Sequence, residues 1–305
     1  MTMKNLPLQI LAAMFCLLTS GSLMSEQSEK LQALVVSGQM NEHHNMALMD
    51  QVVTEYLEQT GLFEVSLVST PPAGENMREF APDFSAYDVV VLNYDGDEWS
   101  EATKYAFEKY VRSGGGMVSV HSTDNAFPEW QAFLEMTGVG GWGERDESWG
   151  PAVFWGERGM EYDYSPGQAF HPKQHVFPVT TRNTEHPVTA GMPATWLHAR
   201  DELYSCLRGP AQNLQVLATG YADQNLAKAS DKDEPAIMAL SYGKGRVFHS
   251  TLGHIGKKAT QAPESVRCAG FISTLQRGAE WAATGVVTQP VPEDFPGPDR
   301  VSVRP

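Results

Sequence analysis

The sequence predicts an α/β protein whose central sheet is mostly parallel and is covered by helices on both faces. Short apolar runs alternate with segments of helical spacing through the first half of the chain, which is typical of parallel strands joined by crossover helices. The runs themselves, such as 87–92, are continuously apolar, as in strands that are buried on both faces. With 305 residues, of which 42% are hydrophobic, the chain can bury a substantial core.

Each element of the first half follows from its own pattern. Met46, Met49 and Val53 recur at helical spacing after the first apolar run, and Gly61 ends that helix. Ser100 is the N-cap of the next helix, which the glycines 114–116 stop. The expected elements are a strand over 31–36, a helix ending near Gln59, strands over 63–68 and 87–92, a helix over 100–112 and a strand over 117–120.

The second half returns to strands after an irregular stretch. Residues 138–170 are rich in glycine and tryptophan and have no clear period, so we expect a long ordered loop there. Residues 286–305 are rich in proline and are expected to lie extended on the surface. The other expected elements are strands over 175–182, 214–219, 236–241 and 246–251 and a helix over 265–283.

The charge balance disfavours two classes of partner. The chain has 22 Lys and Arg residues against 37 Asp and Glu residues, which gives a formal net charge of −15. Nucleic acids and anionic membrane surfaces are bound by basic tracks, so neither is an expected partner. A neutral or cationic small molecule, or a metal ion, is compatible with this balance.

Residues 1–22 have the pattern of a secretory signal peptide. Lys4 supplies a positive n-region, 6–18 is an apolar run too short for a membrane anchor, and 20–22 offer small residues for cleavage. We therefore expect a secreted or periplasmic protein with no membrane association after signal cleavage. Cleavage would leave Cys206 and Cys268 as the remaining cysteines, and the sequence leaves open whether they pair.

Polar side chains gather where the predicted strands end. In an open parallel sheet, ligands bind outside the carboxyl ends of the strands, so these side chains predict the place of an active site. His121 follows the fourth strand, and His249 and His254 lie at or after the last one. The other polar residues of this set are His43, His44, Asn93, Asp95, Asp97, Asp124, His198, Asp201, Glu202 and Tyr204.

The junction at His121 is the most specific of these features. Glycines, a short strand and an abrupt turn into a helix capped by Asp124 and Asn125 match a nucleophile elbow, which exposes one side chain on a strained turn. A glutaminase of this architecture has a cysteine at that point, whereas neither Cys206 nor Cys268 follows such a strand. Hydrolysis of amides by a thiol is therefore not expected.

Six stretches of the sequence carry a resemblance to a known family. They are 92–99 (LNYDGDEW), 114–121 (GGGMVSVH), 186–191 (HPVTAG), 198–204 (HARDELY), 242–254 (YGKGRVFHSTLGH) and 275–281 (LQRGAEW). Together they resemble the ThuA-like (trehalose utilisation) family, a branch of the class I glutamine amidotransferase-like superfamily that lacks the cysteine. The resemblance implies a flavodoxin-like three-layer α/β domain over 31–285, often oligomeric, and a bacterial role in sugar metabolism that includes the processing of keto-glycosides.

The resemblance and the residues at the strand ends favour an enzyme that acts on a sugar or keto-glycoside by acid/base chemistry without a cysteine nucleophile. Such chemistry needs a base and an acid with separated pKa values. Since adjacent residues of an extended segment face opposite ways, Asp201 and Glu202 are not both expected in the site. The candidate catalytic residues are His121, Asp201, Glu202 and His254, and the candidate substrate-binding residues are His44, Asp95, Trp99, Asp124, His198 and Tyr204. Trp142 and Trp149, like Trp99, fit either stacking on a sugar or packing.

Two other functions stay open. His44, His121 and His254 with a carboxylate would suit a divalent metal such as zinc with an open position, as in a metal-dependent hydrolase, although no HExxH or paired CxxC motif is present. Alternatively, the chain is a non-catalytic sugar-binding or interaction module that is exported and assembled with other proteins. For each of these functions, the expected partners include a small-molecule carbohydrate and other copies of the chain. Hydride transfer is disfavoured, because the glycine-rich stretch 138–143 follows a predicted helix rather than a strand.

Overall fold

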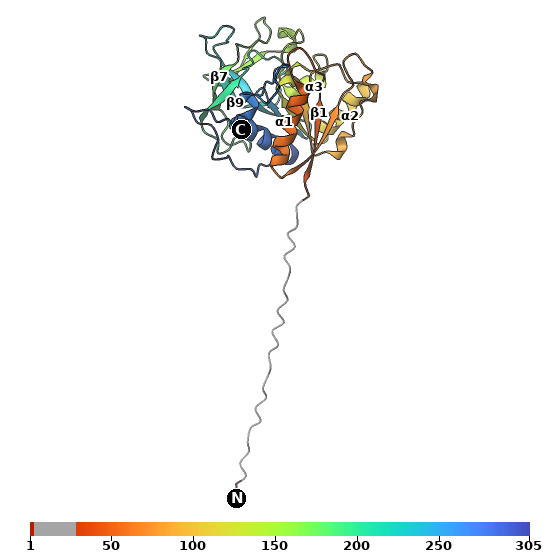
Figure 1. Ribbon diagram of the computed structural model, residues 1–305, viewed down its shortest axis with the longest axis vertical. Helices are drawn as coiled ribbons and strands as arrows, with labels where there is room; N and C mark the ends of the chain where they lie inside the picture. The colour runs from red at the N-terminus through yellow and green to blue at the C-terminus, as the bar shows by residue number, and fades with distance from the viewer. Residues whose placement is uncertain (3–28) are drawn as a thin grey trace.

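One mixed sheet of eleven strands runs through the part of the protein that the structure describes, residues 1–2 and 29–305 of a computed structural model (Figure 1). The main path of the sheet is β2 (Phe63–Ser69), β1 (Leu31–Ser37), β3 (Val89–Asn93), β4 (Gly116–Val120), β11 (Gly245–Ser250), β10 (Asp233–Tyr242), β9 (Leu214–Tyr221), β7 (His175–Thr181) and β8 (Thr195–Asp201). A hairpin of β5 (Ala152–Gly156) and β6 (Gly159–Asp163) is attached to β10.

The sheet has a parallel half and an antiparallel half. From β2 to β11 every strand pairs in parallel with its neighbours, as the sequence predicts for the first half. Beyond β11 the pairing is antiparallel throughout, which the expectation of a mostly parallel sheet did not include. The change occurs because a tight turn, with Gly243 at a φ of +60°, joins β10 to β11, and only antiparallel strands can be joined so closely.

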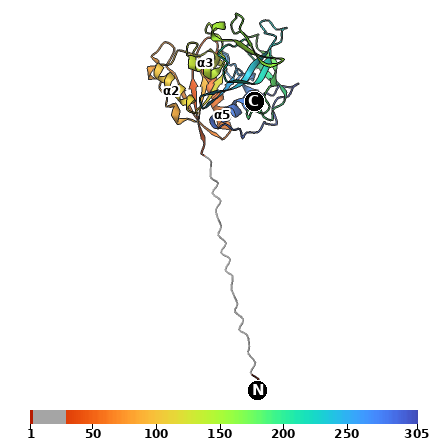
Figure 2. The same ribbon diagram turned by 180° about the vertical axis from the view of Figure 1, so that it is seen from behind.

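Helices cover both faces of the parallel half and make three layers. The α-helices are α1 (Met46–Gln59), α2 (Glu101–Arg112), α3 (Gln131–Thr137), α4 (Glu264–Arg267) and α5 (Ala269–Thr284). In β1, Ala33 and Val35 pack in one core with α1 and α5, while Leu34 and Val36 pack in the other with α2 and α3. One apolar run thus supplies both cores, because successive side chains of a strand point to opposite faces. Figure 1 shows α1 and α2 on opposite sides of β1, and Figure 2 shows α2 and α5 from behind.

The ends of the helices follow their caps. The Ser100 hydroxyl accepts a hydrogen bond from the Thr103 amide at the start of α2, as predicted. Asn45 caps α1 in the same way, and α5 ends at Gly285 in the left-handed conformation. Short 3-10 helices are present at η1 (Met77–Glu79), η2 (Phe84–Ala86), η3 (His121–Asn125) and η4 (Glu147–Trp149).

Three strands were not predicted from the sequence. The stretch 138–170, expected to be a loop, holds η4 and the β5–β6 hairpin, whose Trp155 pairs with Asp233 of β10. The third strand, β8, carries His198 and Asp201 at fully buried positions. Its inward side chains are therefore partly polar, and the alternation of apolar and polar residues that identifies a strand is lost.

The proline-rich tail, residues 286–305, contains no helix or strand and is attached to the domain at specific points. The Ala269 amide at the start of α5 donates to the Ser302 carbonyl at 2.9 Å. Phe295 is only 8% exposed, and its ring centroid lies 5.3 Å from that of Trp196. A buried aromatic ring and backbone hydrogen bonds thus anchor the tail.

The sequence predicts a signal peptide and no membrane association after its cleavage. The predicted signal peptide lies outside the described residues except for its first two. In the described part of the chain, no helix is long and apolar enough to cross a membrane.

Cys206 and Cys268, whose pairing the sequence leaves open, are both free thiols.

Replacing Phe295 with alanine should lower the free energy of unfolding by about 2–4 kcal/mol, because the change removes a nearly buried ring from its contact with Trp196. Urea unfolding of wild-type protein and Phe295→Ala measures the difference. Val286→Ala is the matched control, since Val286 is in the same tail and is 57% exposed. Equal effects of the two substitutions would show that the tail is not docked as described.

Candidate active site

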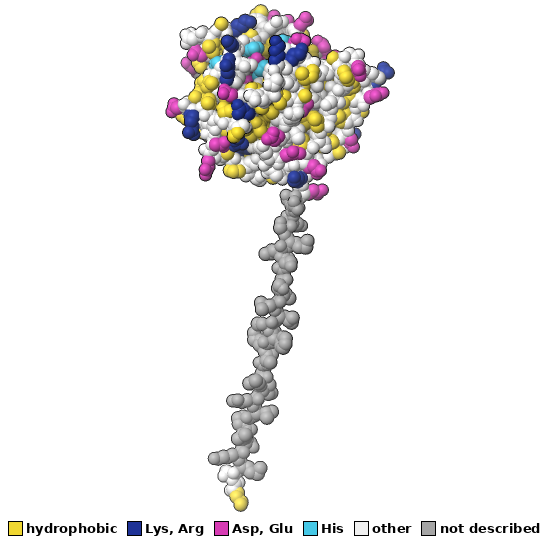
Figure 3. Space-filling model, viewed as in Figure 1, with side chains coloured by type: hydrophobic (Ala, Val, Ile, Leu, Met, Phe, Trp, Pro, Cys, Tyr) yellow, Lys and Arg dark blue, Asp and Glu magenta, His cyan; other side chains and the backbone are white. Residues whose placement is uncertain are grey.

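A cavity of about 350 Å³ lies at the carboxyl ends of the parallel strands, where the sequence places the active site. Its walls come from the loops after β1, β4, β8 and β11 and from the irregular stretch before β7. The lining residues are Glu42, His43, His44, Asn125, Trp142, His171, Glu202, Tyr204 and His254. Figure 3 shows histidine side chains, in cyan, gathered near the top of the molecule with Lys and Arg side chains beside them.

His121 lies beneath this cavity, at the end of β4. Its φ of +36° falls in the left-handed region that non-glycine residues rarely adopt, so the strained turn expected here is present. The structure differs from a nucleophile elbow in two respects. The side chain is only 1% exposed, and the turn continues into the 3-10 helix η3 rather than into an α-helix, since α3 begins only at Gln131.

Hydrogen bonds fix the orientation of the His121 ring. The Thr251 carbonyl lies 2.7 Å from Nδ1 and can only accept, so Nδ1 carries the proton and Nε2 offers a lone pair. The Tyr204 hydroxyl lies 2.7 Å from this Nε2 and donates to it. Nδ1 of His254 lies 3.1 Å from the same atom. Nε2 of His121 is therefore the point on which the side chains of the site converge.

Nε2 of His121 belongs to a cluster of three buried imidazoles. His44, His121 and His254 each offer one nitrogen atom, and these atoms all lie within 4.8 Å of one another. Among the described residues, this group could hold a metal ion. Burial lowers the pKa of His121 well below its ordinary value and also lowers the pKa of His254, even though Glu202 opposes the shift. Both rings are thus neutral near pH 7 and present lone pairs.

Asp95 supports His44 from the side. Its Oδ2 lies 3.8 Å from Nδ1 of His44 and accepts hydrogen bonds from the side-chain amides of Asn41, at 2.8 Å, and Asn125, at 3.2 Å. The two amides hold the carboxylate in one position. Asp95, predicted to bind substrate, is not among the residues that line the cavity, but it touches two that do.

Glu202 is the carboxylate that reaches several histidines at once. Its Oε2 lies 3.2 Å from Nδ1 of His254, 3.8 Å from Nε2 of His171 and 4.0 Å from Nε2 of His121. Burial raises the pKa of the nearby Tyr204 hydroxyl well above its ordinary value, so that group stays protonated as a donor. The pocket thus combines a carboxylate, neutral imidazoles and a phenol, which are groups that act as general acids and bases in enzymes.

Asp201 turns away from Glu202 and from the cavity, in line with the expectation that only one of the two enters the site. It is fully buried and accepts from Nε2 of His198 at 2.8 Å, and from the backbone amides of Gly253 at 2.7 Å and His254 at 3.0 Å. Burial alone would lower the pKa of His198, but the charge and hydrogen bonds of the Cys268 and Asp201 side chains outweigh it and raise the pKa to about 9, while His198 in turn opposes the effect of burial on Cys268 and lowers the pKa of that thiol. This buried pair fixes the loop that carries His254.

Two further residues expected to bind substrate lie in the interior instead. Asp124 is 1% exposed, and its Oδ1 lies 2.5 Å from Nε2 of His249, whose other ring nitrogen donates to the Thr137 carbonyl. Trp99 is 2% exposed in an aromatic cluster with rings such as Phe80, 5.3 Å away. His198, described above, is buried as well. None of these three residues lines the cavity.

Two lining residues come from the irregular stretch before β7. Trp142 has a φ of +58°, and its ring lies 4.3 Å from that of Tyr204 and 6.1 Å from that of His171. The backbones of Phe170 and Ser205 exchange hydrogen bonds of 2.8 and 3.1 Å and so bring this stretch to the site. His171 was not a predicted site residue. It directly follows the irregular stretch 138–170, and the only signal in the sequence was that loops of such length are often functional.

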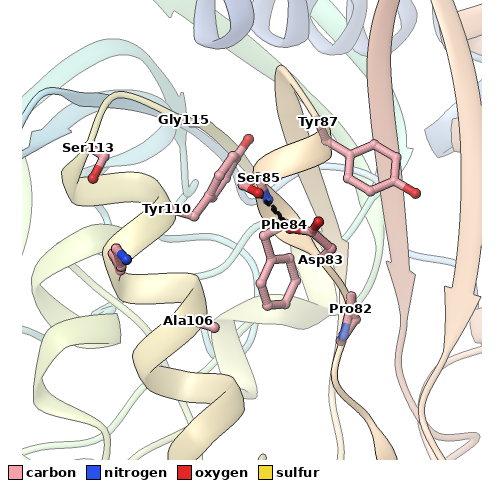
Figure 4. A pocket seen from close by; sticks show the side chains of 10 residues that line it. Pro82, Asp83, Phe84, Ser85, Tyr87, Ala106, Tyr110, Ser113 and Gly115 are labelled. Carbon is pink, nitrogen blue, oxygen red and sulfur yellow. Dashed lines mark hydrogen bonds between the residues drawn. The ribbon is translucent and has the colours of Figure 1, made fainter.

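A hollow elsewhere on the molecule has a different character. It has a volume of about 440 Å³ and lies between η2 and α2 (Figure 4). Its polar side chains serve the fold: Asp83 accepts hydrogen bonds from Ser85, and Tyr110 donates to the Gly116 carbonyl at 2.9 Å. No histidine is among its lining residues, so it lacks the convergent groups of the cavity at the strand ends.

The fold and the cavity together define a three-layer α/β protein with a histidine-rich site at its strand ends. A family model named ThuA and described as trehalose utilisation matches residues 32–282. The chain belongs to this family, as the six sequence stretches predict, and the membership indicates a role in carbohydrate metabolism.

Solved structures agree with this assignment. A ThuA-like protein from Parabacteroides merdae is 42% identical, with a TM-score of 0.87 over 90% of this chain and 98% of that one. Another from Bacteroides uniformis is 17% identical, with a TM-score of 0.53 over 85% of this chain and 93% of that one, which shows a likeness of fold alone. No curated protein matches the chain.

The His198–Asp201 pair should make stability depend on pH above neutrality. Because folding raises the pKa of His198 from 6.5 to about 9, its contribution is fully present below pH 6.5 and is lost as pH rises through about 9. His198→Gln should therefore remove roughly 1–3 kcal/mol of the decrease in unfolding free energy between pH 6 and pH 10. Urea unfolding of both proteins across this range is the measurement, and parallel pH profiles would contradict the assignment.

Proposed function

We propose that the protein is an enzyme that acts on a sugar or keto-glycoside in the histidine-rich cavity, with Glu202 as its acid/base group. The observation that carries the proposal is the position of Glu202, whose carboxylate lies in the cavity wall within 4.0 Å of His121, His171 and His254. Membership in a trehalose-utilisation family supports a carbohydrate as the substrate.

Glu202 can serve either of two related reactions. As a base it would remove a proton from a carbon next to a carbonyl, and as an acid it would protonate a glycosidic oxygen that leaves. The Tyr204 hydroxyl, which stays protonated, can donate to an oxygen on which negative charge develops. The nitrogens of His121 and His254 face the same space, so the reacting oxygen of the substrate would meet the histidine cluster.

The shape of the cavity supports a sugar-sized ligand. A volume of about 350 Å³ is in the range of small-molecule sites. Trp142 offers an aromatic ring on one wall, and Asn125 and Glu42 offer polar groups for hydroxyls on others. An apolar ring face beside hydrogen-bonding groups is what a sugar, with its C–H face and hydroxyl edge, requires.

A thiol mechanism has no support in this site. Neither free cysteine is among the residues that line the cavity. Burial raises the pKa of Cys206 to about 11, which leaves it a thiol rather than a nucleophilic thiolate. The proposal therefore does not include hydrolysis of glutamine.

We also propose a cellular location and a fold class for the protein. The signal-like pattern of residues 1–22 supports action outside the cytoplasm, as a secreted or periplasmic enzyme. The three layers and the parallel half of the sheet support membership in the flavodoxin-like class of α/β folds.

Glu202→Gln should reduce turnover by about 10²–10⁴-fold while leaving the fold intact, because the amide keeps the shape of the side chain but cannot take up or release the proton. The assay is incubation with a panel of glycosides and 3-keto-glycosides, with products followed by mass spectrometry. Glu185→Gln, an exposed site outside the cavity, is the control and should keep wild-type rates.

Two outcomes would count against the enzyme. Equal turnover by the two variants would remove Glu202 from the chemistry. If the wild-type protein binds a sugar, seen as a rise in Tm, but forms no product from any member of the panel, a sugar-binding module is the better description.

A further inference from the structure

We infer that His44, His121 and His254 form a binding site for a divalent transition-metal ion such as zinc, open toward the cavity. The ring centroids of the three residues are 5.4, 5.3 and 5.1 Å apart, a nearly equilateral triangle, and the ring planes are inclined to one another by 64–82°. Imidazole nitrogen is a preferred ligand of zinc, copper, iron and nickel, whereas calcium and magnesium prefer oxygen.

The spacing of the nitrogen atoms fits a common central ion. Tetrahedral zinc with bonds of about 2.0–2.1 Å holds its nitrogen ligands about 3.3 Å apart. Nε2 of His121 and Nδ1 of His254 are 3.1 Å apart, and all three ligand nitrogens lie within 4.8 Å. To complete the set, the ligand nitrogen of His44 has to move inward by up to about 1.5 Å.

Two of the three histidines have a polar group behind the ring, as metal-bound histidines usually do. Such a histidine donates its far N–H to a carbonyl or a carboxylate, which orients the ring. His121 does this to the Thr251 carbonyl at 2.7 Å. For His44 the corresponding group is Asp95, whose Oδ2 lies 3.8 Å from Nδ1.

His44 also presents an unexplained polar atom. The side chain is 7% exposed, and its Nδ1 is buried without a hydrogen-bond partner among the described residues. A buried nitrogen without a partner is uncommon and calls for a ligand or a small rearrangement. The atom without a partner is the one that faces Asp95, so a small rotation of the ring that brings the other nitrogen to a cation would also bring Nδ1 within hydrogen-bonding distance of that carboxylate.

One side of the triangle stays open. Catalytic zinc sites have three protein ligands and leave the fourth position to water or substrate. Here the Tyr204 hydroxyl lies 2.7 Å from Nε2 of His121, and Oε2 of Glu202 lies 3.2 Å from Nδ1 of His254. A bound ion would take the place of these two contacts on the ligand nitrogens and leave both side chains beside the open position. A bound ion would polarise a substrate oxygen, and Glu202 would keep the proton-transfer role assigned to it above. The metal site rests on geometry alone, and its part in turnover rests on the proposed function.

The test is the titration of protein that was purified without a histidine tag and stripped with EDTA. Isothermal titration calorimetry with Zn²⁺ should give one ion per chain, and Co²⁺ should give the visible absorption of a nitrogen-coordinated ion. His44→Gln and His254→Gln should each weaken binding by about 100-fold or more, and Asp95→Asn by about 10–100-fold. His186→Gln, whose ring packs against Trp281 away from the cavity, should bind like wild type. Circular dichroism verifies that each variant is folded.

The result that overturns the inference is binding that is absent, or that is equal in His44→Gln, His254→Gln and His186→Gln. The metal site and the proposed function can fail separately. Full turnover by stripped protein in EDTA would contradict the metal's part in the reaction and leave the enzyme intact. Stoichiometric Zn²⁺ binding without turnover of any glycoside would confirm the site and contradict the proposed reaction.

Discussion

The parallel pairing of β4 with β11 is the constraint on which the site depends. Its register places Val120 opposite Ser250, so the residues that follow, His121 and Thr251, lie side by side. The His121 ring can then donate to the Thr251 carbonyl, and this bond directs Nε2 toward His254. A shift of one residue in this register would turn every side chain of the strand to the other face and disperse the cluster. The chemistry of the cavity is in this sense a consequence of how two apolar strands are aligned.

Two buried ion pairs hold the loops that the register brings together. His198 and Asp201 anchor the backbone at His254, and Asp124 with His249 anchors η3 just after His121. Removing one partner of such a pair leaves a buried charge uncompensated, which is strongly destabilising. Part of the chain's acidic excess, at Asp124 and Asp201, is therefore structural. The polar residues at the strand ends are thus of two kinds. Some face the cavity, and the others are buried and hold the cavity-facing residues in position.

The sequence predicts the parallel half of the fold well and the antiparallel half less completely. Strands such as 87–92 are recognisable because they are apolar throughout, whereas β8 was not recognised because its inward side chains include His198. The expectation that ligands bind at the carboxyl ends of parallel strands identified His44, His121 and His254, whose side chains meet in the structure. It could not tell which polar residues turn inward, since that depends on tertiary pairing. His171 was beyond its reach, because backbone pairing between distant segments brings that loop to the site.

The central claim is that a sugar reacts in the cavity next to Glu202. A crystal structure of Glu202→Gln soaked with a 3-keto-glycoside tests it most directly, because the variant should bind the substrate without consuming it. The account predicts a sugar ring against Trp142, with its reacting atom about 3–3.5 Å from the side chain at position 202. A sugar bound in the hollow between η2 and α2, or in the cavity with its reacting atoms turned away from position 202, would contradict the account.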